Sequence, residues 1–370
     1  MTAPSHLLDL DDSASVTAAD SEGSLRSAAL GGAQVRATAE SVNEGALDRI
    51  RDLRPRSIVL VTGGGRAGRA ASVLTGALGA RIGVPILHLP AVPPWVGSLD
   101  VVVVAGEDAG DPLLLSAVDS ALRRGAEVVI AAPDEGPLRA AGAGRAMQLP
   151  PRIRVADQHG FLRYLSAGLA VLTVLGPSRT DNLLPDLHEL ADAVDAEALR
   201  GHPANEVFHN PAKSLAVRMG GRRVVLAGDG PATGALARHG AEVLMRTAGA
   251  VVAAADLSDV VASATRFASG GSVADAAGYD PIFHDEELDG PPPSNPVRVF
   301  VLSSAATKAA ASRRIAVLRD AELVLAVEDD EEIDKGGREM AGERTEIEQL
   351  AVTAVRLEMA AAYLQLIGGS

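Results

Sequence analysis

Gly63, Gly64 and Gly65 form the clearest candidate for a chemical site in this sequence. With Gly68 they complete a GxGxxG pattern that follows the apolar run Ser57–Thr62 and precedes a stretch compatible with a helix. Glycines in such a turn let the backbone bend tightly, so that amides at the helix N-terminus can face an anion, with Arg66 as a nearby cation. The turn therefore either faces a phosphate or a sugar, or is a tight connection without a ligand.

A dinucleotide-binding site is a further alternative for the same turn. Such a site needs an acidic residue about 20 positions later to hold the ribose. The second apolar run instead ends in His88, Leu89 and Pro90, without an acidic residue. A nicotinamide-dependent oxidoreductase therefore remains only as the third functional hypothesis.

A second group of polar side chains follows the apolar run Val297–Leu302 and comprises Ser303, Ser304 and Thr307. Hydroxyl groups donate hydrogen bonds to phosphate oxygens, so this group can form an anion site. The same residue types commonly cap helix N-termini, which is the alternative without a ligand. Four other residues are weaker candidates for a cleft, the last as a substitute base: Glu206, His209, Asn210 and Glu242.

Alternating strands and helices must position these groups. Short apolar runs separated by helical stretches are typical of parallel sheets with both faces covered. The predicted strands are residues 57–62, 84–89, 100–105, 127–132, 222–227 and 297–302; the predicted helices include residues 45–53, 67–79, 112–124 and 161–175. The strand-and-glycine unit of residues 56–65 recurs about 166 residues later, ending in Gly228, Asp229 and Gly230, which predicts a duplicated domain.

The composition excludes several classes of function. Hydrophobic residues make up 47% of the 370 residues but aromatic residues only 2%, so small aliphatic side chains must fill closely spaced layers. A net charge of −14 argues against nucleic acid as a partner. There is no cysteine, which excludes disulfides, thiolate catalysis and zinc–thiolate sites. We also expect no signal peptide and no membrane span, and hence a cytoplasmic location.

An apolar stripe marks the C-terminal stretch. Its members recur every three or four residues, as on one face of a helix: Ile347, Leu350, Ala354, Leu357, Ala361 and Leu364. Such a helix packs either on its own domain or on a second copy of the chain. A homodimer therefore remains one of these two alternatives.

Several segments, taken in order, resemble the bifunctional phosphoglucose/phosphomannose isomerases of the SIS (sugar isomerase) superfamily. The glycine turn is similar to that family's first Gly-rich turn, and Asn210-Pro211-Ala212-Lys213 is close to the motif that opens its second domain. Residues 93–96 resemble its Pro-Trp-Val segment, residues 125–133 a following strand, and residues 283–286 its His-Asn-Glu motif.

The resemblance implies aldose–ketose isomerisation of a hexose 6-phosphate, in which a His opens the ring, a Glu moves a proton between C1 and C2, and an Arg stabilises the enediolate. His284 matches the ring-opening residue and Arg163 the enediolate partner. The sequence departs from the family in the loop after the third strand, where Glu107, Asp108 and Asp111 replace hydroxyl side chains. It also lacks a carboxylate where the family places its catalytic Glu.

We therefore expect an α/β protein of two SIS-type domains, each a parallel sheet flanked by helices in three α/β/α layers. Residues 1–44 form an N-terminal segment, partly disordered or with a docking helix; residues 45–200 form the first domain and residues 201–370 the second, with its C-terminal helix. The expected ligand is a sugar phosphate or another carbohydrate derivative, with no metal and no organic cofactor. The protein either isomerises that sugar or is a catalytically degenerate binding or regulatory protein.

Overall fold

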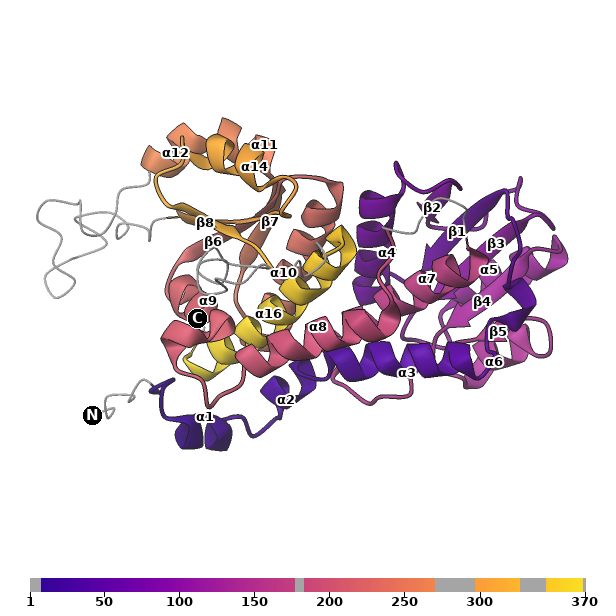
Figure 1. Cartoon of the computed structure of the whole chain (residues 1–370), viewed down its shortest axis with the longest axis horizontal. Helices are drawn as coiled ribbons and strands as arrows, with labels where there is room; N and C mark the ends of the chain where they lie inside the picture. The colour runs from indigo at the N-terminus through magenta and orange to yellow at the C-terminus, as the bar shows by residue number, and fades with distance from the viewer. Residues whose placement is uncertain (1–7, 177–182, 270–296, 327–343, 369–370) are drawn as a thin grey trace, which may run out of the picture.

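The computed structural model describes residues 8–176, 183–269, 297–326 and 344–368. Two parallel β-sheets, one in each half of the chain, are flanked by helices (Figure 1), which confirms the predicted α/β class. The first sheet contains β1 (Ser57–Thr62), β2 (Ile86–Leu89), β3 (Asp100–Ala105), β4 (Glu127–Ala131) and β5 (Met147–Gln148). The second sheet contains β6 (Arg223–Gly228), β7 (Val252–Asp256), β8 (Val297–Leu302) and β9 (Ala321–Val324).

Most of these strands are followed by a helix, and further helices precede the first strand and separate the two sheets along the chain. The helices up to residue 200 are α1 (Ser13–Ala19), α2 (Ser24–Ala28), α3 (Gly31–Asn43), α4 (Gly65–Leu78), α5 (Pro112–Arg123), α6 (Gly136–Gly142), α7 (Phe161–Leu175) and α8 (Leu187–Arg200). Those that follow are α9 (Pro211–Met219), α10 (Pro231–Ala248), α11 (Leu257–Ala262), α12 (Ala264–Ser269), α14 (Lys308–Ile315) and α16 (Glu346–Leu366).

The two sheets share one strand order. It is β2-β1-β3-β4-β5 in the first sheet and β7-β6-β8-β9 in the second, and every neighbouring pair is parallel. In β1 the side chains of Ile58 and Leu60 join one buried cluster, and those of Val59 and Val61 join another on the opposite face. Both faces are covered, which explains why the strand reads as a continuous apolar run.

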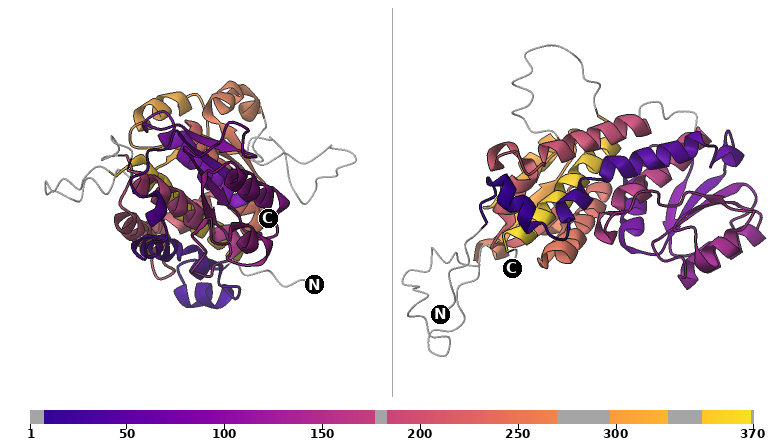
Figure 2. Two further views of the ribbon diagram at one scale, coloured as in Figure 1. Left: turned by 90° about the vertical axis from the view of Figure 1, so that its right-hand side faces the viewer. Right: turned by 90° about the horizontal axis from the view of Figure 1, so that it is seen from below.

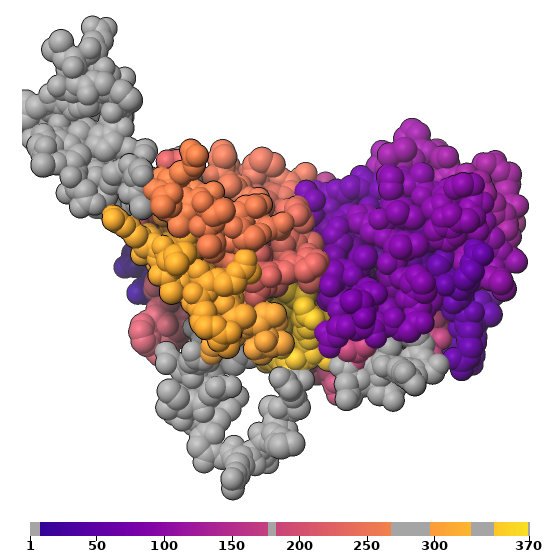
Figure 3. Space-filling model, turned by 90° about the horizontal axis from the view of Figure 1, so that it is seen from above, coloured from indigo at the N-terminus to yellow at the C-terminus, as the bar shows by residue number. Residues whose placement is uncertain are grey.

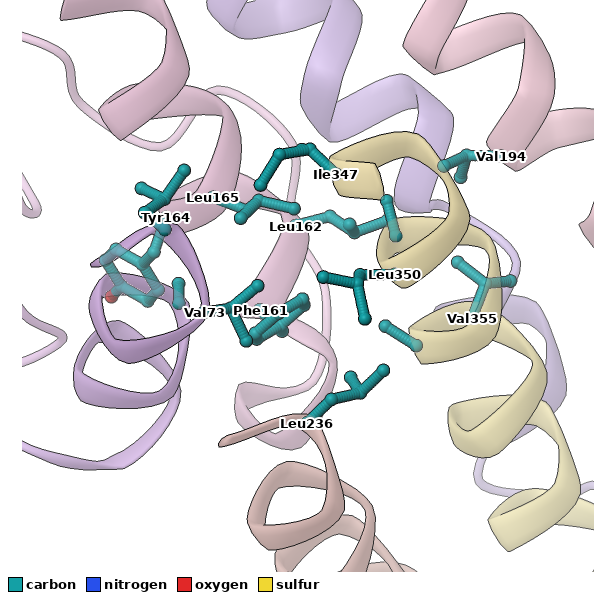
Figure 4. Close-up of a cluster of buried hydrophobic side chains, with 14 of the residues drawn as sticks. Val73, Phe161, Leu162, Tyr164, Leu165, Val194, Leu236, Ile347, Leu350 and Val355 are labelled. Atoms are coloured by element: carbon teal, nitrogen blue, oxygen red, sulfur yellow. The ribbon is translucent and has the colours of Figure 1, made fainter. Parts of the chain in front are cut away.

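The space between the two sheets is filled by helices. The helices α4 and α7 pack on each other beside the first sheet, α10 and α16 pack on each other beside the second, and α10 also packs on α4. Figure 4 shows Val73 of α4, Phe161 of α7, Leu236 of α10 and Leu350 of α16 meeting in this layer. One apolar cluster therefore runs from one sheet to the other.

The helices α4 and α10 approach each other unusually closely. Each follows the first strand of its half, and each has a glycine as its N-cap, Gly64 for α4 and Gly230 for α10. A β-carbon at Gly76 of α4 would lie 2.6 Å from the backbone nitrogen of Ala232, so only glycine fits at this crossing. In the space-filling view the two halves form directly adjoining lobes (Figure 3).

The N-terminal region packs on the rest of the molecule. The helix α3 starts beside α16, where a β-carbon at Gly31 would lie 3.1 Å from Val355, and continues against α7 and α8 (Figures 1 and 2). The helix predicted over residues 45–53 is wrong. Only a 3₁₀ turn, Asp48–Ile50, forms there, because Gly45 and Asp52 adopt positive φ angles of 91° and 63° that interrupt a helix.

The C-terminal stripe is buried within the chain itself. All six of its residues are buried, and α16 packs against α8, α9 and α10. Nearly the whole circumference of α16 is covered, so it is a central helix and not a surface helix with one apolar face. In the described part of the chain, no helix combines the length and the apolar character needed to cross a bilayer.

Candidate functional site

The glycine turn, residues 63–65, lies at the point where the strand order of the first sheet reverses. The connections from β1 and β3 leave in opposite directions there, and ligands of open α/β sheets bind in the crevice at such a point. Gly64 has φ 87° and Gly65 has φ 51°, so the turn needs residues without a β-carbon. The sequence-based placement of a glycine bend between strand and helix is confirmed.

The turn is open to solvent. All three glycines are exposed, and a β-carbon at Gly64 would meet no described atom within 4 Å. Gly64 is the N-cap of α4 and has no side chain with which to satisfy the first-turn amides. Those amides and the helix dipole consequently make the open side of the turn favourable for a negatively charged or oxygen-rich group.

Arg66 lies directly behind the turn and joins the two halves. Its side chain is only 5% exposed; Nη1 donates to Glu242 Oε1 at 2.9 Å, and Nη2 pairs with Glu107. Glu242 belongs to α10 of the second half and also faces Arg69 Nε at 3.4 Å. Arg66 is therefore already occupied by carboxylates from both halves.

Two carboxylates border the turn on the side of the loop after β3. Glu107 pairs with Arg66, and Asp111 caps α5 by accepting from Leu113 N at 2.8 Å. A β-carbon at Gly63 would lie 2.9 Å from Asp111 Oδ2, which places this carboxylate against the turn. A dianionic phosphate at the turn would meet repulsion from both groups.

A third feature of the site is a hydrogen-bonded chain of Thr62, His88 and Ser72. Thr62 Oγ1 lies 3.0 Å from His88 Nε2, and Ser72 Oγ lies 3.2 Å from His88 Nδ1. Burial lowers the pKa of His88, so the ring is neutral at pH 7. The sequence alone predicted no role for these residues. Only their positions in the predicted elements could have identified them. Thr62 ends one strand, His88 lies near the end of the neighbouring strand, and Ser72 lies two turns into α4.

The second sheet carries Ser303, Ser304 and Thr307 at the equivalent end of β8. Ser303 Oγ donates to Asp229 Oδ2 at 2.5 Å and lies 3.0 Å from Thr307 Oγ1, which lies 3.1 Å from Ser304 Oγ. A hydroxyl has one proton, so Thr307 donates to Ser303 and Ser304 donates to Thr307. All three protons are thus directed along a chain that ends on Asp229, and an anion would have to compete with that carboxylate.

The predicted catalytic residues are not brought to the glycine turn by any described contact. Arg163 on α7 donates from Nη2 to Tyr164 Oη at 2.7 Å, and its guanidinium lies 4.6 Å from the centre of that ring. Tyr164 and Thr62 line one small, largely apolar cavity between the first sheet and α4. His284 lies outside the described residues.

Residues 210–213, the segment with the most specific resemblance, make hydrogen bonds that stabilise the fold. Asn210 caps α9 by accepting from Lys213 N at 2.9 Å. The Lys213 side chain is fully buried, and Nζ donates to the carbonyls of Leu10, Pro203 and Asn205 at 2.6 to 2.8 Å. Lys213 therefore links the N-terminal segment to the loop before α9 through hydrogen bonds, and it does not face the glycine turn.

The other weak candidates are similarly placed. Glu206 precedes the 3₁₀ turn Val207–His209, on a surface loop next to α9, and Glu242 is held in its ion pair with Arg66 and Arg69. Among the described residues, no group of three or more His, Asp or Glu side chains is arranged to hold a metal ion.

No protein-family model and no curated protein matches this sequence. Solved structures do match its fold. A protein from Clostridium difficile 630 assigned as a phosphosugar isomerase superposes with a TM-score of 0.60 at 10% identity, over 94% of this chain and 93% of its own. Tagatose-6-phosphate ketose/aldose isomerase from Escherichia coli gives 0.58 at 14% identity, over 93% and 91%.

A third solved structure with the same architecture is the C-terminal domain of glucosamine-fructose-6-phosphate aminotransferase from Francisella tularensis. Its TM-score is 0.59 at 11% identity, over 94% of this chain and 96% of that domain. The superposition extends over both sheets in each case, because more than nine-tenths of each chain is covered. This chain therefore has the same double-sheet α/β fold as these three solved structures.

Proposed function

We propose that this protein binds a phosphorylated sugar, or another carbohydrate derivative, at the glycine turn. The observation that carries the proposal is the open N-terminus of α4 at the reversal point of the sheet, capped by Gly64 without a side chain. Amides and the helix dipole at such a point attract phosphate and polarised oxygens. The names of the solved structures with this fold support the same class of ligand.

The carboxylates around the turn set the limit on affinity. Glu107 occupies Arg66, and Asp111 lies against Gly63, so each opposes a phosphate group. At a water-screened separation each repulsion amounts to about 1 kcal/mol. The amides of the turn must therefore outweigh this repulsion when they bind a phosphate.

Two forms of this function remain as proposals. One is isomerisation of glucose 6-phosphate or mannose 6-phosphate, in a cytoplasmic protein of two domains, residues 45–200 and 201–370, that works alone or as a homodimer. The other is a binding or regulatory protein without turnover. The second is favoured by Glu242, because both of its carboxylate oxygens are already paired, Oε1 with Arg66 and Oε2 with Arg69.

Titration calorimetry with glucose 6-phosphate and fructose 6-phosphate tests the binding site. We expect Glu107→Gln to tighten binding about fivefold, which corresponds to the removal of about 1 kcal/mol of repulsion. Asp119→Asn is the matched control, because Asp119 is an exposed carboxylate on α5 that pairs with Arg123 in its own helix turn. An unchanged affinity for Glu107→Gln, or no binding of either sugar, would refute the placement at the turn. A coupled isomerase assay on the same samples separates turnover from binding.

A further inference from the structure

The two sheets end in four edge strands, β2 and β5 in the first sheet and β7 and β9 in the second. On its outer side an edge strand leaves backbone N–H and C=O groups without a strand partner, so it can pair with a strand of another chain. Proteins commonly prevent such pairing with proline, with charged side chains on the strand or by keeping the strand short. The four edges can be compared by these three features.

Three of the edge strands have such protection. The strand β2 lies directly between Pro85 and Pro90. The strand β5 is only two residues long. The strand β9 carries Glu322, whose carboxylate forms ion pairs with two arginines. A second chain is therefore hindered from adding a strand at each of these three edges.

The strand β7 lacks these features. It contains no proline and no charge before its last residue, Asp256, and the strand that it pairs with in the described part of the chain is β6. Ala253 and Ala254 point to opposite faces of the sheet, yet both are exposed. Val251, directly before the strand, is 91% exposed. Within the described residues, β7 is therefore an open and largely apolar edge.

Opposite charges lie at the two ends of this edge. Arg246 is in the last turn of α10, which leads into the start of β7, and Asp256 ends the strand. Both residues are exposed, and neither side chain has a hydrogen bond or ion pair with another described residue. The strand itself spans about 13 Å at the usual rise per residue, which separates the two ends.

We propose that the open edge of β7 is the interface of a homodimer, in which two copies of β7 pair antiparallel across a two-fold axis. Such an axis brings the same surface of both copies together, so that every contact occurs twice. Antiparallel pairing brings the partner's Asp256 to the start of β7, on the side of Arg246, and the partner's Arg246 to its end. The two four-stranded sheets then form one continuous sheet.

The charges favour a second copy over an unrelated acidic or basic segment. A cation at one end and an anion at the other are matched by a strand that carries the same two charges in reverse order, which a two-fold axis supplies. The small side chains of Ala253 and Ala254 leave room for the second strand, and pairing removes part of Val251 from water. The interface belongs to the second half of the chain, whereas the glycine turn belongs to the first, so the two proposals are independent.

Sedimentation velocity over a range of protein concentrations measures the dimer dissociation constant. The wild type should sediment with twice the mass of one chain. Arg246→Asp and Asp256→Arg each create two like-charge pairs, and each should weaken the dimer by about tenfold. The double variant restores opposite charges and should return to within about threefold of the wild type. Failure of a double variant with an unchanged circular dichroism spectrum to recover would overturn the antiparallel arrangement.

Arg313→Asp is the matched control for these reversals. Arg313 is likewise an exposed arginine in the last turn of a helix, but its helix, α14, packs against β9 at the opposite edge of the sheet. The dimer constant should therefore stay at the wild-type value. An equal weakening by Arg313→Asp would overturn the assignment of the interface to β7.

Single cysteines test the strand contact without changing any charge. The chain has no cysteine, so an introduced thiol can form a disulfide only with the same residue of a second copy. Under mild oxidation, Ala253→Cys or Ala254→Cys should give a covalent dimer, because one of these central positions lies at or beside the two-fold axis, whereas Ser312→Cys on α14 should not. A chain that sediments as a monomer at every concentration, or a dimer without a disulfide at either alanine position, would overturn the proposal.

Discussion

The buried ion pair between Arg66 and Glu242 should couple the two halves energetically. Replacing Arg66 by Met removes a charge-assisted hydrogen bond of 2.9 Å to a carboxylate that is 15% exposed. Such a bond contributes about 1.5–3 kcal/mol, and breaking a fully buried pair costs about 3–5 kcal/mol. Arg69 stays within 3.4 Å of Glu242 and Glu107 can turn to water, so we expect about 3 kcal/mol of destabilisation from Arg66→Met.

A double-mutant cycle isolates the pair from the rest of the site. Urea unfolding of the wild type, Arg66→Met, Glu242→Gln and the double variant gives the free energy of unfolding of each, with the slope against urea as a check that the denatured state is unchanged. The double variant should be less destabilised than the sum of the single variants by about 2 kcal/mol. Effects that add to within about 0.5 kcal/mol would refute the coupling, because independent sites behave that way.

Two further predictions concern the packing of the core. Although alanine normally stabilises a helix, Gly76→Ala should lower the free energy of unfolding in urea by about 1–3 kcal/mol, because its β-carbon would meet the backbone of α10. Gly83→Ala is the neutral control, because a β-carbon there would have no neighbour within 4 Å. A more stable Gly76→Ala variant would contradict the close helix crossing. Among the described residues, neither ring nitrogen of buried His159 has a hydrogen-bond partner, and burial lowers its pKa. The unfolded chain therefore binds this proton first as the pH falls below about 6.5, so stability decreases there by up to about 1.4 kcal/mol per pH unit. His159→Phe should flatten that slope between pH 6.5 and pH 5, and an unchanged slope would count against the assignment.

Strands with both faces covered were predictable from the sequence. Ser57–Thr62, Asp100–Ala105 and Val297–Leu302 have the predicted bounds, because each is a run of branched apolar residues. The strand Val252–Asp256 was missed: it is an edge strand rich in alanine and largely exposed, so it lacks both the alternation and the β-branched residues that mark a strand. The two-residue strand Met147–Gln148 is too short to leave any pattern.

The site was predictable only in its local part. The glycine bend follows from residue types alone, since positive φ angles require glycine. Its partner Glu242 lies 176 residues away from Arg66 along the chain, and their contact depends on how two helices cross. The grouping of His88 with Ser72 likewise depends on the packing of α4 against β2, which no spacing in the sequence encodes. The assignments of Arg163 and His284 stay predictions.

The apolar cluster between the sheets has a consequence for dissecting the molecule. Leu60 of the first sheet and Phe300 of the second belong to the same cluster, together with side chains of α7 and α16. Each half expressed separately would leave its share of that cluster in water, at about 25 cal/mol for every Å² uncovered. The intact chain should therefore melt in a single cooperative transition, while its isolated halves aggregate.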